Sequence, residues 1–296
     1  MVRTYYMHKI QSCEAGMSIE NYMKSFGYSQ HLIRAIRNIP NGITIDGVHV
    51  YTTKILTGNE TIIIKLPLKD SSSAIIPVPQ KFETVYEDED IMVINKPANM
   101  PVHPSQGNYG NTLANGIAYL FEQNGDPFVF RAINRLDRDT SGLLIIAKNP
   151  LSACILSDMI KKREIHREYL AIATGLTDDK GTIDAPIARR DGSTIERCVD
   201  YEHGEAAITH YNRIDYKNGF SLLRISLETG RTHQIRVHLK HIGHPLPGDF
   251  VYNPDYTYIS RQALHSASIS FIHPITKEEM HFEAEMPEDM RRVMSD

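Results

Sequence analysis

Strand-like segments joined by short turns dominate the later part of the chain. Residues 143–147 form a short apolar run with the length of a strand buried on both faces. Residues 167–173 alternate as a strand does, and residues 206–216 and 220–227 read as two strands joined at a Lys-Asn-Gly turn. Successive strands with short connections predict an α+β fold, in which helices pack on a mixed, mainly antiparallel sheet.

The N-terminal part of the chain has a pattern of its own. Ser18 and Ser29 each precede a helical pattern, in the position of an N-cap residue. Residues 43–50 alternate around an Asp-Gly pair, which predicts a hairpin, and residues 61–66 read as a closing strand. This order predicts two helices followed by a small sheet.

A polar segment at residues 69–73 is a candidate linker between two domains. We therefore expect a small domain with its linker over residues 1–76 and a larger domain over residues 77–296. Within the larger domain, Asn149 followed by Pro150 predicts the start of a helix, because an asparagine caps well and a proline is tolerated in the first turn.

Composition places the chain among globular proteins. It has 296 residues, of which 41% are hydrophobic, enough for a sizeable core. It contains no apolar run that could span a bilayer and no apolar N-terminal segment typical of a signal peptide. Cys13, Cys154 and Cys198 are scattered, which suits reduced thiols in a cytoplasmic protein. The net charge is -4, so nucleic-acid binding would need a local basic surface.

The most distinctive chemistry lies directly before the apolar run. Arg135, Asp137, Arg138 and Asp139 alternate in charge, and a Thr-Ser-Gly turn then leads into residues 143–147. A loop held by a buried strand is well suited to carry a catalytic group. A plainer interpretation is that Asp139 bonds the backbone of the turn while the arginines pair with the carboxylates.

Residues 135–142 resemble the signature of the RluA-type pseudouridine synthases, which isomerise uridines in ribosomal or transfer RNA. In that family the segment reads His-Arg-Leu-Asp, two variable positions and Thr-Ser-Gly. The resemblance implies that Asp137 is the catalytic carboxylate. Asn134 stands where the family usually has histidine, which puts a local hydrogen bond in question.

Further segments match the family in the family's order. The resemblance covers roughly residues 82–290 and implies the synthase catalytic core, a mixed, mainly antiparallel sheet divided by a cleft and flanked by helices. The matching segments are residues 90–97, 102–104, 229–236, 243–249 and 263–266.

The resemblance also implies roles for individual residues. Arg236 would pair with Asp137, and Tyr169 would pack on the target base. Arg135 or Arg138 would fill the gap left by a flipped base or hold phosphates. The reaction breaks the bond between ribose and base nitrogen and rejoins the base through carbon without redox change, so no cofactor is expected. Other residues of the matching segments are expected to contact substrate: His103, Arg231, His233 and Gln234.

Two basic groups are expected to contact RNA. The helix after Asn149 ends in cations, which either complement the helix dipole or bind phosphates. The N-terminal part loosely resembles the alpha-L RNA-binding domain, whose second helix faces RNA; the alternative is an ordinary solvated helix face. The expected RNA-binding residues are Arg34, Arg37, Lys161, Lys162, Arg163 and Arg167.

A metal site is the first alternative. His233, His238, His241 and His244 lie in or beside a helix expected to begin with a cap at Thr232 and to end at Gly243. Histidines three apart on a helix can share a metal. No carboxylate or thiolate follows at a typical ligand spacing within the helix, so we expect no metal.

The substrate and the reaction leave further alternatives. Large-subunit ribosomal RNA is the first expectation and transfer RNA the second. A catalytically silent RNA-binding protein on this scaffold, or a hydrolase that uses Asp137 and Asp139 as a carboxylate pair, are the other possibilities. We expect a monomer whose partner is RNA, with no membrane association.

Overall fold

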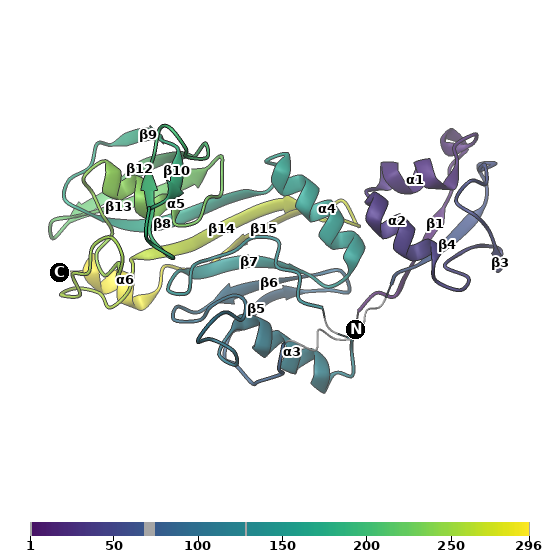
Figure 1. Ribbon diagram of the computed structural model, residues 1–296, viewed down its shortest axis with the longest axis horizontal. Coiled ribbons are helices and arrows are strands. Elements are labelled where there is room, and N and C mark those ends of the chain that lie inside the picture. Colours follow the sequence, from purple (N-terminus) through teal and green to yellow (C-terminus); the bar gives the residue numbers. More distant parts are fainter. Residues whose placement is uncertain (1, 68–74, 128, 296) are drawn as a thin grey trace.

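The structure is a computed structural model that describes residues 2–67, 75–127 and 129–295. A small sheet with two helices stands at one end of the molecule, and a much larger sheet extends to the other (Figure 1). The predicted α+β class with a mixed, mainly antiparallel sheet is confirmed. The candidate linker at residues 69–73 lies outside the described residues.

The small sheet has four antiparallel strands in the order β1-β4-β2-β3. The Ser18 and Ser29 hydroxyls each accept a backbone N–H of the first helical turn at 3.2 Å, so both predicted N-caps are confirmed. The sequence pattern did not predict β1. The elements are β1 (Tyr5–Lys9), η1 (Ser12–Glu14), α1 (Ile19–Phe26), α2 (Gln30–Arg37), β2 (Ile43–Ile45), β3 (Val48–His49) and β4 (Thr61–Lys65).

The large sheet has nine strands in the order β5-β6-β7-β14-β8-β13-β12-β9, with β15 also paired to β14. Its strands are β5 (Glu83–Glu87), β6 (Ile91–Lys96), β7 (Ser141–Ala147), β8 (His166–Thr174), β9 (Lys180–Asp184), β12 (Ile208–Lys217), β13 (Phe220–Leu227), β14 (Leu264–Ile272) and β15 (Glu279–Glu283). A separate hairpin consists of β10 (Ile187–Arg189) and β11 (Arg197–Val199). The helices are α3 (Leu113–Gln123), α4 (Pro150–Lys161), α5 (Gln234–His241) and α6 (Glu288–Val293). Within the described residues, no helix is long and apolar enough to cross a bilayer.

A short parallel pairing joins the two halves of the large sheet. Among the described strands, β7 and β14 form the one parallel pair, in which Ser266 lies opposite Gly142. Gly142 has φ +108°, and a Cβ atom there would lie 2.2 Å from the carbonyl oxygen of Ser266. Only glycine allows both this backbone conformation and this close approach. Every residue of β7 is buried, so the loop before it is carried by a rigid strand.

The small sheet and its helices share an apolar core with the large sheet. Residues of α1, α2 and β4 pack in one continuous cluster with buried residues of β6, β7 and α4. Gly27 comes close to Ile155 of α4, since a Cβ atom on Gly27 would lie 2.6 Å from Ile155 Cγ1. The N-terminal elements are therefore packed on the rest of the protein along α4, as Figure 1 also shows.

A polar junction reinforces this contact. The buried Asp90 carboxylate accepts hydrogen bonds from Arg3 Nε at 3.0 Å, from the Tyr6 hydroxyl and from Asn149 Nδ2 at 2.7 Å. Arg3 and Tyr6 belong to the N-terminal part, whereas Asn149 caps α4, with its side chain accepting the Leu151 N–H at 3.1 Å. Asp90 thus connects the N-terminal part to α4, the helix on which the small sheet and its helices pack.

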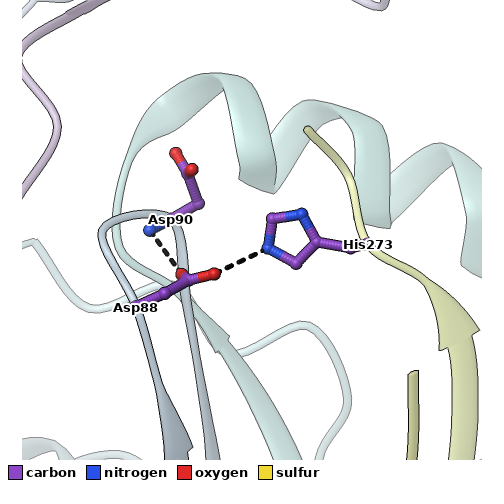
Figure 2. A group of neighbouring side chains, drawn as sticks. All are labelled: Asp88, Asp90 and His273. Atoms are coloured by element: carbon purple, nitrogen blue, oxygen red, sulfur yellow. Dashed lines mark hydrogen bonds and ion pairs between the residues drawn. The ribbon is translucent and has the colours of Figure 1, made fainter. Parts of the chain in front are cut away.

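Asp88 and His273 complete this junction (Figure 2). Asp88 Oδ1 accepts the backbone N–H of Asp90 at 2.7 Å, and Oδ2 lies 2.9 Å from His273 Nε2. His273 Nδ1 accepts the backbone N–H groups of Ile275 and Thr276, so Nε2 carries the ring proton and faces the carboxylate. The three side chains are close enough to hold a metal ion, but protein donors already occupy the carboxylate oxygens of Asp88 and Asp90.

Candidate active site

The loop that carries Asp137 is built against the edge of β7. The Ile133 N–H donates to the carbonyl of Ile145 at 2.9 Å, so the chain before the loop runs beside this strand. Where this backbone pairing ends, Asn134 Oδ1 accepts the Ile145 N–H at 2.9 Å. Residues 135–140 then turn back into β7, and the Thr140 N–H donates to the Asp137 carbonyl at 3.1 Å. Asn134 therefore provides a local hydrogen bond in the position where the family usually has histidine.

Arg236 on α5 reaches the Asp137 carboxylate across the molecule. Its Nη1 donates to Asp137 Oδ2 at 2.8 Å, although the two residues are 99 positions apart in the sequence. The guanidinium is only 1% exposed. Its remaining side bonds Asp249, with Nε to Oδ2 at 2.6 Å and Nη2 to Oδ1 at 2.7 Å. This forked contact fixes the plane of the guanidinium and so the direction of the bond to Asp137.

Electrostatics keep Arg236 charged. Burial by itself lowers the pKa of Arg236, but the hydrogen bond with Asp249 and the charges of both carboxylates outweigh it and raise the pKa above its usual value. Asp249 is fully buried and also accepts the backbone N–H groups of Val251 and Tyr252. Asp249 ends the matching segment at residues 243–249, but no role was expected for it. The sequence signal that could have identified Asp249 is its carboxylate, which is a possible partner for a buried arginine.

The start of α5 differs from the prediction. Thr232 does not cap the helix: His233 is the N-cap residue, with φ +60° and no side-chain cap bond. The first turn is instead fixed by Gln234, whose Oε1 accepts from the Thr229 hydroxyl and the Arg231 N–H at 2.9 Å each. The spacing of residues in the sequence does not show that the Gln234 side chain bonds the preceding loop. The sequence pattern therefore indicated Thr232, a residue type that commonly caps helices. The predicted helix end holds, since Gly243 follows with φ +84°.

His233 lies beside the two charged groups. Its Nδ1 is 2.9 Å from the Tyr252 hydroxyl, and its Nε2 is 3.9 Å from Asp137 Oδ2. Burial lowers the pKa of His233, the charge of Asp137 opposes this shift, and the charge of Arg236 adds to it. The imidazole is therefore neutral at pH 7.

A cavity of about 1160 Å³ opens on Asp137. Tyr169, in β8 and 4% exposed, forms part of its wall, and so does His103, whose ring lies 5.7 Å from that of Phe130. A smaller hollow of about 60 Å³ beside Asp137 is lined by Tyr169, His233 and Arg236. Among the described lining residues of the large cavity, the basic side chains outnumber the two carboxylates, Asp137 and Glu228. The basic residues include Arg135, Arg138, Lys161, Arg163, Arg167 and Arg231.

Several of these cations already have partners. Arg138 pairs with Asp139 at 2.9 Å, Arg163 with Glu228 at 2.6 Å, and Arg231 with Glu205. All three pairs are partly exposed, so exchange of a carboxylate partner for a phosphate costs little.

Other expected RNA-binding residues lie outside the cavity lining. Lys162 pairs with Asp158 at 2.8 Å, one turn earlier in α4. Arg37 on α2 pairs with Glu20 of α1, and Arg34 is an exposed residue of the same helix. The structure thus brings the α4 end, the Asp137 loop and the loop before α5 together around the cavity, whereas its described lining contains no residue of α2.

The clustered histidines turn to different partners. His238 Nδ1 lies 2.9 Å from the Thr209 hydroxyl, and its Nε2 lies 2.9 Å from the Ala185 carbonyl. His244 Nδ1 lies 2.8 Å from the carbonyl of Thr174. Asp139 likewise faces Arg138 rather than Asp137, so the two carboxylates do not form a facing pair.

Comparison with known proteins places this site in a family. The model of the RNA pseudouridylate synthase family matches residues 90–241. The chain belongs to this family. The "Uncharacterized RNA pseudouridine synthase YjbO" of Bacillus subtilis is 37% identical over 279 residues, 94% of this chain and 98% of that protein. The "Ribosomal large subunit pseudouridine synthase D" of Zymomonas mobilis is 40% identical, over 77% of this chain and 79% of its own.

Solved structures agree with this assignment. Human RNA Pseudouridylate Synthase Domain Containing 1 superposes with a TM-score of 0.59 at 25% identity, over 69% of this chain and 83% of that one. Human RNA Pseudouridylate Synthase Domain Containing 4 shares the fold, with a TM-score of 0.57 at 21% identity, over 71% of this chain and 90% of that one. The protein is therefore an RNA pseudouridine synthase, an isomerase that modifies RNA.

Proposed function

We propose that this pseudouridine synthase uses Asp137 as its reacting carboxylate and Arg236 to position it. The single observation that carries this is the asymmetry of the carboxylate. Asp137 Oδ2 accepts the Arg236 N–H at 2.8 Å, whereas Oδ1 accepts no hydrogen bond from the described residues. One oxygen is thus held and the other is available to the substrate in the cavity.

The hollow beside Asp137 suits a base taken out of its stack. A base inside an RNA stack cannot reach a carboxylate on the protein, so it must be everted. Tyr169 supplies an aromatic wall on which uracil can stack, and Leu227 and Leu264 line the same hollow. Arg135 or Arg138 would then occupy the gap left in the RNA, or hold its phosphates, because both lie on the loop that carries Asp137.

Basic side chains around the cavity would bind the RNA backbone. The protein has a net charge of -4, so attraction for RNA has to come from a local surface. Four of the basic side chains line the cavity from different elements: Lys161 ends α4, Arg163 follows it, Arg167 lies in β8, and Arg231 lies in the loop before α5. His103 would contact substrate from the wall of the cavity, and His233 lies in the smaller hollow beside Asp137. Gln234 is buried with both ends of its amide bonded within the protein, so it would act by fixing the start of α5.

We further propose large-subunit ribosomal RNA as the substrate, with transfer RNA as the second candidate. Relatives named "Ribosomal large subunit pseudouridine synthase D" at 35–40% identity support the first choice. Residues 1–76 would form an accessory RNA-binding domain that uses Arg34 and Arg37, and residues 77–296 the catalytic domain.

The test compares pseudouridine maps of cellular RNA. RNA from a strain that lacks the protein is mapped by carbodiimide-dependent primer extension, with and without complementation by wild type, Asp137→Asn or Glu168→Gln. Glu168 pairs with Arg224 at 3.7 Å on an exposed surface and serves as the matched control.

We expect one or more large-subunit sites to disappear, and to return with wild type and Glu168→Gln but not with Asp137→Asn. Return with Asp137→Asn contradicts the role of Asp137. A change confined to transfer RNA replaces the proposed substrate by the second candidate.

A further inference from the structure

We infer that His233 is a second positioning residue for Asp137, and that Tyr252 and the backbone of β11 select the ring tautomer that makes this possible. The inference rests on the proposed role of Asp137. A chain of contacts runs from the β10–β11 hairpin, through Tyr252 and His233, to the reacting carboxylate.

The hydrogen bonds of Tyr252 determine the tautomer. Burial raises the pKa of Tyr252 to about 12, so the phenol keeps its proton at neutral pH. Its oxygen accepts the backbone N–H of Arg197, the first residue of β11, at 2.8 Å. The phenol proton is then free for His233 Nδ1, which lies 2.9 Å away. A nitrogen that accepts carries no proton, so the proton of the neutral ring is on Nε2.

This Nε2–H faces Asp137. It lies 3.9 Å from Oδ2, the same oxygen that Arg236 holds at 2.8 Å. An approach of about 1 Å would give a hydrogen bond of ordinary length, and contacts in catalytic sites commonly tighten when substrate binds. Two donors on Oδ2 would fix the rotation of the carboxylate and direct Oδ1 towards the uridine.

The backbone conformation of His233 is consistent with a requirement to place its ring between Tyr252 and Asp137. It adopts φ +60°, a left-handed conformation that costs most residues about 1 kcal/mol or more and that asparagine, aspartate and histidine adopt more often than other non-glycine residues. The ring makes no cap bond to its own helix. The ring lies between Tyr252 on its Nδ1 side and Asp137 on its Nε2 side, so the imidazole bridges these two groups.

Two substitutions at His233 test the contributions of its two ring nitrogens separately. In His233→Asn the short amide can accept from Tyr252 near the Nδ1 position but does not reach Asp137. In His233→Gln the longer amide places an N–H near the Nε2 position. The probe is total RNA from the strain that lacks the enzyme, converted by purified full-length protein. The rate of pseudouridine formation at the responding site is measured with enzyme in excess, and RNA affinity is measured separately.

We expect His233→Asn to slow the reaction about tenfold, as loss of a hydrogen bond to a charged group does, and to change RNA affinity by less than about twofold. His233→Gln should recover most of the rate. Tyr252→Phe should slow the wild type but cause no further loss in the His233→Asn background, because Tyr252 acts through the histidine.

Three results would overturn the inference: an unchanged rate in His233→Asn, no advantage of His233→Gln over His233→Asn, or an equal effect of Tyr252→Phe in both backgrounds. Asp137→Asn in the same assay tests the proposed function separately. If Asp137→Asn converts RNA at the wild-type rate, the proposed function fails. If Asp137→Asn is inactive while all His233 variants are unimpaired, only the role of His233 fails.

Discussion

Arg236 is held by two carboxylates, and this arrangement makes it difficult to replace. Asp249 bonds it through two N–H groups and Asp137 through a third. Lysine has the same charge but lacks the planar set of donors, so it cannot satisfy both carboxylates in this geometry. A substitution here should therefore disturb the direction of the Asp137 carboxylate rather than the attraction for RNA.

Arg236→Lys is accordingly predicted to lower the single-turnover rate about 10- to 100-fold, the range for a lost hydrogen bond between charged groups, with RNA affinity within about twofold of wild type. Rapid-quench measurements of pseudouridine formation and filter binding check the two quantities. Arg224→Lys is the control, because Arg224 is exposed and pairs loosely with Glu168 at 3.7 Å. A large loss of affinity in Arg236→Lys would contradict the assigned role.

Asn134 gives a second prediction at this scale. It is 4% exposed, and its side-chain oxygen is the partner of the Ile145 N–H. Asn134→Ala leaves that buried N–H unpaired, so the free energy of unfolding should fall by about 1–3 kcal/mol. Asn134→His can offer Nδ1 to the same N–H and should lose less. Urea unfolding of the three proteins ranks them, and equal stability of the alanine and histidine variants would refute the hydrogen-bond argument.

At the scale of elements, the sequence correctly predicted the helices and strands that are marked by short local patterns such as caps and turns. The caps at Ser18 and Ser29 and the hairpin of β12 and β13, with its turn at Asn218 and Gly219, were read correctly from short patterns. β1 was missed because a five-residue edge strand without turn signals has little local signature. The cap of α5 was wrong because Gln234 bonds a loop that precedes the helix.

The site could be predicted only in part. Asp137 and Arg236 were identified from the resemblance to a family. Nothing in the spacing of the chain predicts that these residues, 99 positions apart, are in contact. The contacts of Asp249 and Tyr252 were not foreseen, since each depends on the packing of α5 and β11. Local patterns specify elements, whereas buried polar networks arise from how those elements meet.

The parallel contact between β7 and β14 leads to a prediction about stability. Gly142→Ala adds a Cβ atom 2.2 Å from the Ser266 carbonyl oxygen at φ +108°, so the strands must separate. We expect a loss of at least about 3 kcal/mol in the free energy of unfolding. Gly219→Ala is the control, because Gly219 also has positive φ (+82°) but nothing within 4 Å. Its loss should stay near about 1 kcal/mol. Similar losses in both variants would show that backbone strain alone matters.

For the whole molecule, two buried histidines predict sensitivity to acid. Burial lowers the pKa of His8, in the small sheet, and of His265, in the large sheet, to about 4. The unfolded chain takes up these protons near pH 6.5, and the folded protein does not until about pH 4. Stability is therefore fully present above pH 6.5 and declines as the pH falls, by about 3 kcal/mol for each histidine by pH 4.

Urea unfolding across this pH range measures the decline. His8→Gln should reduce the slope, because it removes one of the two histidines whose pKa is lowered to about 4 in the folded protein. A slope unchanged by this substitution would contradict the contribution assigned to His8.

The packing of the small sheet on α4 affects how such enzymes can be recombined. If the N-terminal part were a tethered module, it could be exchanged between relatives at any point in the linker. Here Gly27 lies against Ile155, and Asp90 bonds Arg3, Tyr6 and Asn149. A chimaera that takes only the N-terminal residues from a relative would pair mismatched surfaces. The unit of exchange has to include the turn at Asp88–Asp90 and the side of α4 that packs on the N-terminal part, so these surfaces are constrained to change together.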